Sequence, residues 1–301
     1  MPLAALFAEA TPASLSALVR EQGAGAAQGP LVPLASGRPG APALVLVHEV
    51  SGGVLEYLDL CHELGRQGVG AHGVVAPGYD GGDERPMDSV ERLAERYVDE
   101  LLASDIAPPY RLVGWSFGGP VAYAMARRLE TMGRPAAAVA RLDAPAAGDG
   151  VRREASAARA LAVRQMAERL EVELAPGADQ AADALEAALR EALVRRRLVA
   201  QAEVDRVLGR QLAVLEAHDR AMSAFRADGG LRSDLVLLAA AESPAADGER
   251  TAALWQAATA GVVRRRTVPG SHLTMVRGPN AQSLVEALVA EAVVPLEADR
   301  R

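Results

Sequence analysis

The sequence has little of several residue types, and each shortage excludes a class of protein. Cysteine occurs once in 301 residues, at Cys61, so no internal disulfide can form and a reducing, cytoplasmic setting is expected. Lysine is absent: all 32 basic residues are arginine, which indicates a coding bias rather than a function. No uncharged apolar run approaches the roughly 18 residues of a membrane helix, so no membrane partner is expected.

The sequence also lacks a basic block. Its 39 acidic and 32 basic residues give a net charge of −7, which makes it a poor binder of nucleic acid. The arginine triplets at 195–197 and 264–266 are interpreted as solvated faces, with contacts to an acidic partner as the alternative. No metal-ligand cluster, Walker loop or dinucleotide fingerprint occurs, so neither a metal nor a bound cofactor is expected.

What the sequence does contain is an alternation of apolar runs and helical stretches, which predicts an α/β fold with a mostly parallel sheet and helices on both faces. Short apolar runs are typical of strands covered on both sides. They occur at 44–47, 110–113, 137–142, 234–239 and 262–268, with helical stretches at 54–67, 89–104 and 118–132.

Two regions depart from this alternation. Residues 151–227 are nearly all helical, and Leu185, Leu189 and Leu193 repeat every four residues. We expect about three amphipathic helices inserted between two strands, where they cap the sheet or cover a site.

The N-terminal part is different again. Residues 1–22 contain a short helical piece, and 23–42, rich in Gly, Ala and Pro, predict a linker. The α/β domain is therefore expected over 43–296.

The strongest chemical motif is Gly114-Trp115-Ser116-Phe117-Gly118, a G-x-S-x-G sequence between a predicted strand and a predicted helix. A tight elbow there would hold the Ser116 hydroxyl at its tip, with glycines where side chains would collide with backbone. The helix behind it points N–H groups and its positive dipole end at the site. These features predict a nucleophilic serine.

A serine hydroxyl needs a base, and the chain order in such folds is serine, acid, histidine. His272 follows the strand ending near Val268 and can reach the carboxyl edge of the sheet. His48, His62 and His72 lie too early in the chain, and His218 falls on an inserted helix, where a structural role is expected. His272 is therefore the predicted base.

The acid that orients the histidine should end a strand between the two. Asp143 directly follows the run at 137–142, whereas Glu242 ends the next strand, and Asp234 is a third alternative. The oxyanion of a tetrahedral intermediate needs two N–H groups. We assign them to Phe117, after the nucleophile, and to Val50, in the glycine-containing loop after the first apolar run.

With these residues in place, the chain resembles the thioesterase domains of nonribosomal peptide and polyketide synthases, which have the α/β-hydrolase fold, from about residue 31 to 292. The resemblance implies that the acid is Asp143 rather than Glu242 and that the helices of 151–227 form a lid. Glu49 departs from the family, which usually has proline there. The stretches that carry the resemblance are 44–48 with Gly52-Gly53, Ala76-Pro77-Gly78, 109–119, 142–145 and Gly270-Ser271-His272.

Residues 1–22 add a related observation. Leu6-Phe7 and Thr11 to Leu15 resemble the last helix of a carrier domain. The resemblance therefore implies a chain-releasing thioesterase preceded by a carrier domain, whose phosphopantetheine arm delivers the acyl thioester; release would occur by hydrolysis or macrocyclisation. The alternatives are a stand-alone editing thioesterase, a small-molecule esterase or lipase, and an inactive hydrolase fold that serves as a docking module.

Overall fold

The computed structural model describes residues 29–38, 41–79, 84–145, 155–170, 172–174, 181–227, 229–243 and 248–294. The predicted carrier-like segment, 1–22, lies outside the described residues, as do 23–28 of the predicted linker. In the part of the chain that is described, no helix combines the length and the apolar character needed to cross a membrane.

A seven-stranded sheet forms the centre of the described structure, in the order β1-β3-β2-β4-β5-β6-β7. Every neighbouring pair is parallel except β1 and β3. The predicted mostly parallel sheet is therefore confirmed. The strands are β1 (Leu31–Ala35), β2 (Leu44–Val47), β3 (Ala71–Val74), β4 (Arg111–Trp115), β5 (Ala138–Leu142), β6 (Leu235–Ala240) and β7 (Val263–Val268).

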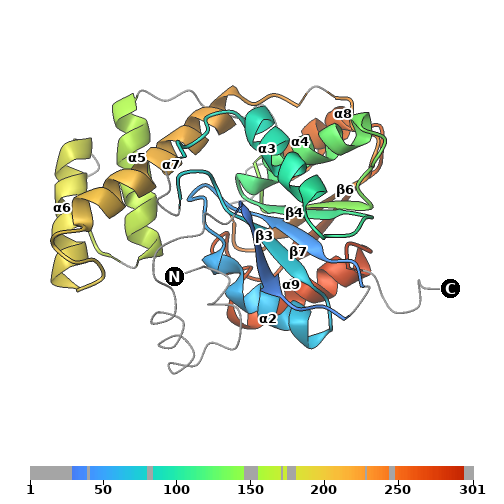
Figure 1. Cartoon of the computed structure of the whole chain (residues 1–301), viewed down its shortest axis with the longest axis horizontal. Helices are drawn as coiled ribbons and strands as arrows, with labels where there is room; N and C mark the ends of the chain where they lie inside the picture. The colour runs from blue at the N-terminus through green and yellow to red at the C-terminus, as the bar shows by residue number, and fades with distance from the viewer. Residues whose placement is uncertain are drawn as a thin grey trace.

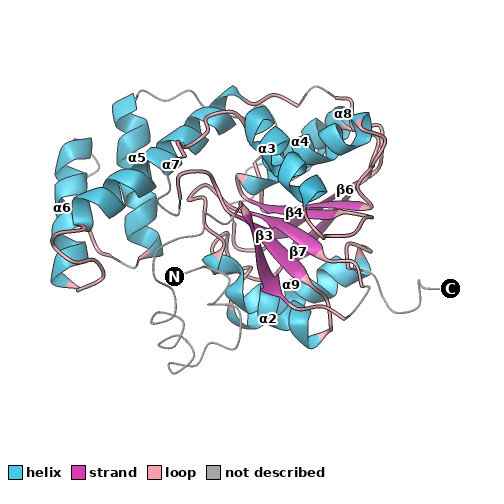
Figure 2. Cartoon of the chain, viewed as in Figure 1, coloured by secondary structure: helices cyan, strands magenta, loops and turns pink. Residues whose placement is uncertain are grey.

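Helices cover both faces of the sheet (Figure 2). One face packs on α2 (Leu58–Arg66), which follows the short 3-10 helix η2 (Leu55–Tyr57), and on α9 (Gly278–Ala290). The other face packs on α3 (Val90–Ala103), α4 (Gly118–Thr131) and α8 (Gly248–Ala258). Strands β2, β4, β5 and β6 are almost wholly buried by this arrangement, as the sequence predicted. Strand β7, predicted to be of the same kind, is instead an edge strand, and only its last residue is buried.

Strand β1 corrects the predicted linker. Residues 31–35 lie in the range assigned to a linker, yet they pair with β3, and Val32 and Leu34 are each only 3% exposed. Pro33 is tolerated because β1 is an edge strand, where a missing N–H removes no ladder bond from a second neighbour. The sheet domain therefore begins before residue 43.

The described residues of the predicted insertion form three helices: α5 (Ala155–Arg169), α6 (Ala182–Arg195) and α7 (Val204–Ala224). We call them the helical insertion. Their four-residue spacing places Leu185, Leu189 and Leu193 on one face of α6, and this face is buried. In Figure 1, α5 and α6 stand away from the sheet, and α7 runs from them toward it.

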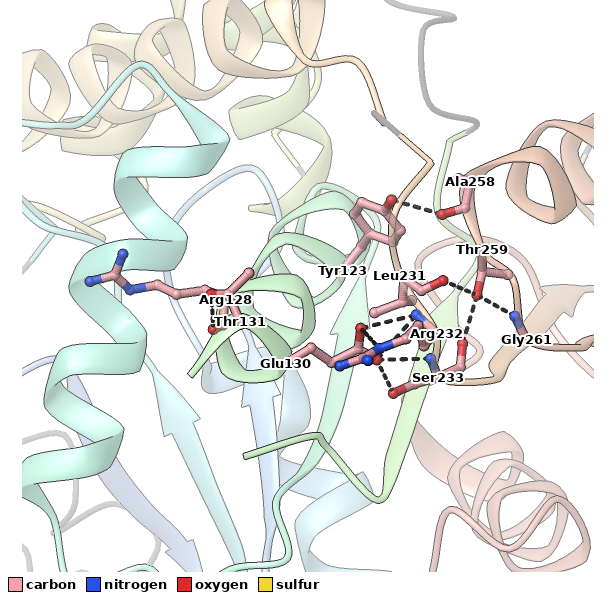
Figure 3. A network of polar contacts seen from close by, with 10 residues as sticks. All are labelled: Tyr123, Arg128, Glu130, Thr131, Leu231, Arg232, Ser233, Ala258, Thr259 and Gly261. Carbon is pink, nitrogen blue, oxygen red and sulfur yellow. Dashed lines mark hydrogen bonds and ion pairs between the residues drawn. The ribbon is translucent and has the colours of Figure 1, made fainter. Parts of the chain in front are cut away.

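A buried carboxylate ties the far end of α4 to the chain entering β6 (Figure 3). Glu130 is 6% exposed and accepts hydrogen bonds from the Arg232 and Ser233 backbone N–H groups and from the Ser233 hydroxyl. Burial alone would raise the pKa of Glu130, but these hydrogen bonds outweigh it and lower the pKa. The contact fixes α4, and so the turn at its start, against β6.

Candidate active site

The turn between β4 and α4 holds Ser116 in a conformation that L-residues rarely adopt. Its φ angle is 52°, and its N–H donates to the Leu142 carbonyl at 2.9 Å, which extends the pairing of β4 with β5 by one residue. Such a backbone costs roughly 1–3 kcal/mol and persists where its surroundings impose it.

The glycines beside this turn are required by space. A Cβ atom on Gly114 would lie 2.0 Å from the Gly118 carbonyl oxygen, and one on Gly118 would lie 2.5 Å from the His48 carbonyl oxygen. No flexible side chain could move away, because both obstacles are backbone. The strand, the helix and the loop after β2 therefore meet at van der Waals distance behind Ser116.

His272 lies in the loop between β7 and α9 and connects the serine to an acid. Its Nε2 is 3.1 Å from Ser116 Oγ, and its Nδ1 is 2.7 Å from Asp143 Oδ2. His272 is 156 positions from Ser116 and 129 positions from Asp143 in the sequence, so the fold brings together three residues that are far apart along the chain. Such a hydrogen-bonded line can move a proton from the hydroxyl onto the imidazole.

Asp143 follows the end of β5 with a φ angle of 42°. Its carboxylate also accepts hydrogen bonds from the Ala240 N–H and the Ser243 hydroxyl. Burial by itself would raise the pKa of Asp143, but the hydrogen bonds from His272, Ser243 and Ala240 outweigh it and lower the pKa. The group is therefore held as a carboxylate.

The two alternative acids lie elsewhere. Asp234 directly precedes β6 and so lies at the amino-terminal ends of the strands, opposite Ser116. There it accepts hydrogen bonds from Arg264 and from the Val262 N–H. Glu242 follows β6 and is exposed, and its N–H donates to the Gly270 carbonyl. Neither is a hydrogen-bond partner of His272 among the described residues.

Val50 and Phe117, predicted to supply oxyanion N–H groups, flank the site from the loop after β2 and from the turn. Neither N–H has a hydrogen-bond partner in the described part of the chain. His218 of α7 supports both residues: its Nδ1 donates to the Val50 carbonyl at 2.8 Å, and its ring stacks on Phe117 with centroids 4.6 Å apart. His218 is thus structural, as its helix position suggested.

His48 completes this stack on the other side of His218, with centroids 4.9 Å apart. Its Nδ1 donates to the Glu49 carbonyl, and its Nε2 accepts from the Tyr97 hydroxyl, each at 2.7 Å, which describes a neutral imidazole. Burial lowers the pKa of His48 to about 4 and that of His218 well below its ordinary value. Both rings are therefore neutral at pH 7.

Three positioning contacts were missed from the sequence. The Trp115 Nε1 donates to the His272 carbonyl at 3.1 Å, and Ser243 donates to Asp143. Glu49, 2% exposed, accepts from both the N–H and the hydroxyl of Ser51 and so holds the loop that carries Val50. Only Glu49 had a sequence indication, as the departure from proline.

A cavity of about 590 Å³ opens beside Ser116 and His272. Its walls come from the ends of β5, β6 and β7, with Met222 of α7 and Thr251 of α8 on the side of the insertion. No group of three or more His, Cys, Asp or Glu side chains that could hold a metal occurs among the residues that the structure describes.

The strand order, the strained serine turn and the histidine loop define the α/β-hydrolase fold. Residues 42–291 match the thioesterase domain model, and the chain belongs to that family. It is a thioesterase domain of the type found in nonribosomal peptide and polyketide synthases.

The relatives are much longer proteins. CymA, a nonribosomal peptide synthetase of Salinispora arenicola, is 32% identical over 143 residues, which are 48% of this chain and 2% of CymA. A solved four-domain nonribosomal peptide synthetase, holo-AB3403, superposes with a TM-score of 0.74 at 19% identity, over 94% of this chain and 21% of that one.

A shorter protein has a similar fold. The type II thioesterase BorB, from the borrelidin biosynthetic cluster, superposes with a TM-score of 0.64 at 20% identity, over 90% of this chain and all of BorB. The fold alone therefore does not separate chain release from editing.

Proposed function

We propose that this chain is a chain-releasing thioesterase that takes an acyl, peptidyl or polyketide chain from a carrier-domain thioester onto Ser116 and releases it by hydrolysis or macrocyclisation. The observation that carries the proposal is the hydrogen-bonded line from Ser116 through His272 to Asp143, with separations of 3.1 and 2.7 Å. It lies in a thioesterase-family chain, beside a cavity that could hold an acyl group.

In the first half-reaction, the Ser116 oxygen attacks the thioester carbonyl while the His272 Nε2 takes its proton. Asp143 accepts the Nδ1–H of His272, keeps the ring in the tautomer that leaves Nε2 free to act, and stabilises the imidazolium. The C–S bond then breaks, the proton passes to the departing phosphopantetheine thiol, and the acyl group remains on Ser116.

We assign to the Val50 and Phe117 N–H groups the stabilisation of the negative charge that develops on the carbonyl oxygen. The start of α4, at Gly118, adds its positive dipole end to the same place. The Val50 N–H shares its peptide unit with the Glu49 carbonyl, which accepts from His48 Nδ1 at 2.7 Å. His218 holds the next peptide unit through the Val50 carbonyl, so an inserted helix helps to place the loop that carries this N–H.

In the second half-reaction, His272 removes a proton from the acceptor that attacks the acyl ester. Water as acceptor gives an acid, and a hydroxyl or amine of the chain itself gives a ring. Met222 of α7 lines the cavity, so the insertion stands where it could restrict water, which would favour ring closure.

The proposed partner is a carrier domain, because the curated relatives are whole synthetases and the sequence of 1–22 resembles the end of a carrier. The chemistry needs no bound cofactor, since the phosphopantetheine arm arrives with the substrate. A cytoplasmic location belongs to the same proposal and agrees with the lone, buried Cys61.

Acylation of Ser116 is the test of this proposal. The chain is incubated with acyl thioesters of a pantetheine mimic and, separately, with a fluorophosphonate, and the modified peptide is found by mass spectrometry. Both adducts should map to Ser116 and disappear in Ser116→Ala, with a loss of turnover of at least about 10⁴-fold. Acylation that persists in Ser116→Ala refutes the nucleophile, and absence of both adducts in folded protein favours an inactive docking module.

Substrate comparisons separate the alternatives. Faster cleavage of a nitrophenyl ester than of the matched thioester would favour an esterase. The similarity to BorB makes editing the second candidate, and preferential clearance of acetylated carriers over carriers with long chains would favour it.

A further inference from the structure

A buried arginine lines the active-site cavity. Arg141 lies on β5, two residues before Asp143, and is 1% exposed. Its register partners are Gly114 on β4 and Leu237 on β6, so it belongs to the same strand ends that carry the serine and the acid. The proposed mechanism assigns it no role.

Only part of the hydrogen-bonding capacity of the Arg141 guanidinium is used. One face covers the Trp255 ring, with Cζ 3.4 Å from the ring centroid, and Nη2 donates to the Pro145 carbonyl at 2.7 Å. The Nε and Nη1 atoms are buried and have no hydrogen-bond partner among the described residues. Two nitrogens of a charged group, with three N–H donors between them, therefore have no acceptor in the described part of the chain, beside a cavity.

The group lies close to the reacting serine. A Cβ atom on Gly119, three residues after Ser116, would be 3.1 Å from Arg141 Nε and 3.2 Å from Nη2. The guanidinium thus packs against the first turn of α4. That turn carries the positive end of the helix dipole, which repels a cation rather than stabilising it.

The described residues around Arg141 provide no free counter-charge. The acidic side chain that lines the cavity, among the described residues, is Asp143, which is engaged by His272, Ser243 and the Ala240 N–H. A second arginine, Arg265 of β7, lines the same cavity from an exposed position. Burial lowers the pKa of Arg141, which is the direction expected when a cation loses water without gaining an anion.

We propose that Arg141 is a specificity-determining residue that binds a carboxylate carried by the acyl chain, an inference that rests on the proposed thioesterase function. A carboxylate accepts charge-assisted hydrogen bonds from guanidinium N–H groups and supplies a negative charge in a water-poor site. The phosphate of the carrier arm is the other anion of the system. It is separated from the thioester sulfur by the whole pantetheine, whereas Arg141 packs one helical turn from Ser116.

The test uses N-acetylcysteamine thioesters, which carry no phosphate. Chains of four to ten carbons end in a carboxylate, in the isosteric amide or in a methyl group, and kcat/KM is measured by thiol release. At one chain length, we expect kcat/KM for the carboxylate substrate to exceed kcat/KM for the matched amide by about tenfold or more. Equal kcat/KM for carboxylate and amide at every length overturns the proposal, and this arm needs no variant.

Variants then assign the preference to Arg141. Arg141→Met keeps an apolar stem over Trp255 and should reduce the carboxylate-to-amide ratio to about one, mainly through KM, with the amide kcat/KM changed less than about threefold. Arg141→Lys should retain part of the preference, and Arg265→Met most of it. A purely structural role predicts that Arg141→Met lowers both substrates equally, and that result overturns the proposal.

The same experiment keeps the two proposals apart. Turnover of amide and methyl thioesters, with acyl groups on Ser116, tests the thioesterase function without reference to charge. If those substrates react and the carboxylate has no advantage, only the role of Arg141 fails. If no thioester of any kind acylates Ser116, the proposed function fails and the role of Arg141 with it.

Discussion

The carboxyl edge of the sheet and the helical insertion are stabilised in different ways. At the edge, Ser116 and Asp143 have positive φ angles, and each N–H donates to the next strand, at Leu142 and Leu238. In the insertion, regular helices pack on buried leucines such as Leu189, and partly exposed ion pairs join one helix to the next.

Because of this difference, we expect substitutions in the two regions to affect different properties of the protein. Backbone hydrogen bonds and close contacts fix the edge, so a small change of its side chains should alter the reaction more than the fold. The insertion depends on apolar burial, so truncating its leucines should change stability more than the chemistry at Ser116. Each of the following predictions tests one side of this contrast.

The largest effect is expected at the edge. Asp143→Asn should slow turnover by about 10⁴-fold, because the imidazole loses the carboxylate that holds its tautomer and stabilises its charge. Thermal unfolding should change far less. Steady-state thioester cleavage gives the rate, and Glu242→Gln is the matched control. A comparable loss in Glu242→Gln would show that Asp143 is not the acid.

On the other side of the contrast, Leu189→Ala should destabilise the insertion by roughly 2–5 kcal/mol, because it removes a fully buried side chain of α6. Hydrogen exchange should rise in α5–α7 while β4–β7 stay protected. Cleavage of a short thioester should remain within a fewfold of wild type. Equal loss of protection in the sheet would contradict the separation of the two regions.

The histidine stack gives the edge a pH dependence. Because burial lowers the His48 pKa from 6.5 to about 4, the unfolded chain binds a proton between these values that the folded chain does not. Protonation of His48 therefore does not affect the free energy of unfolding above pH 6.5. As the pH falls from 6.5 to 4, the free energy of unfolding decreases by about 3 kcal/mol.

His218 acts in the same direction, because burial also lowers its pKa. The Asp143 carboxylate, with its lowered pKa, loses its contribution only at more acid pH, since its unfolded value is already near 4. Urea unfolding at pH 7 and pH 5 measures the histidine effect. Equal free energies of unfolding at the two pH values would contradict the buried, neutral stack.

The smallest effect is expected at the ion pairs of the insertion. Glu186 accepts from Arg159 at 2.7 Å and from Arg190 at 3.2 Å, in partly exposed positions. Glu186→Gln should cost about 1 kcal/mol or less, and less still at high salt. Glu191→Gln, which affects the exposed pair with Arg195, should cost even less. A loss above 2 kcal/mol at Glu186 would show that charge, not apolar packing, stabilises the insertion.

The sequence predicted the parts of the fold that rest on local pattern. The apolar strands of the sheet centre and the leucine spacing of α6 are such patterns, and the structure has these elements. Strand β3 was not predicted because Ala71-His72-Gly73-Val74 is short and contains a glycine and a histidine. Strand β1 was hidden by Pro33 and neighbouring glycines, since only its pairing partner makes it a strand.

The candidate site divides in the same way. Ser116 and His272 were predicted from strand ends and chain order, whereas Asp143 was preferred to Glu242 on the family resemblance. The structure has His272 in hydrogen-bond contact with both Ser116 and Asp143, and their catalytic roles stay a prediction. Ser243 and Arg141 could not be found from the sequence, because their relevance depends on the pairing of β5 with β6. A serine after a strand and an arginine within one carry no pattern of their own.

The anchoring of Asp143 to β6 has a consequence for engineering. The bonds that place this acid, from its N–H to Leu238 and from the Ala240 N–H to its carboxylate, pass directly between two strands that the whole insertion separates in sequence. A graft that replaced the helices between these strands with a differently shaped cover would leave both bonds intact. The chain could then accept new product shapes through one exchangeable segment while its proton-transfer geometry is inherited unchanged.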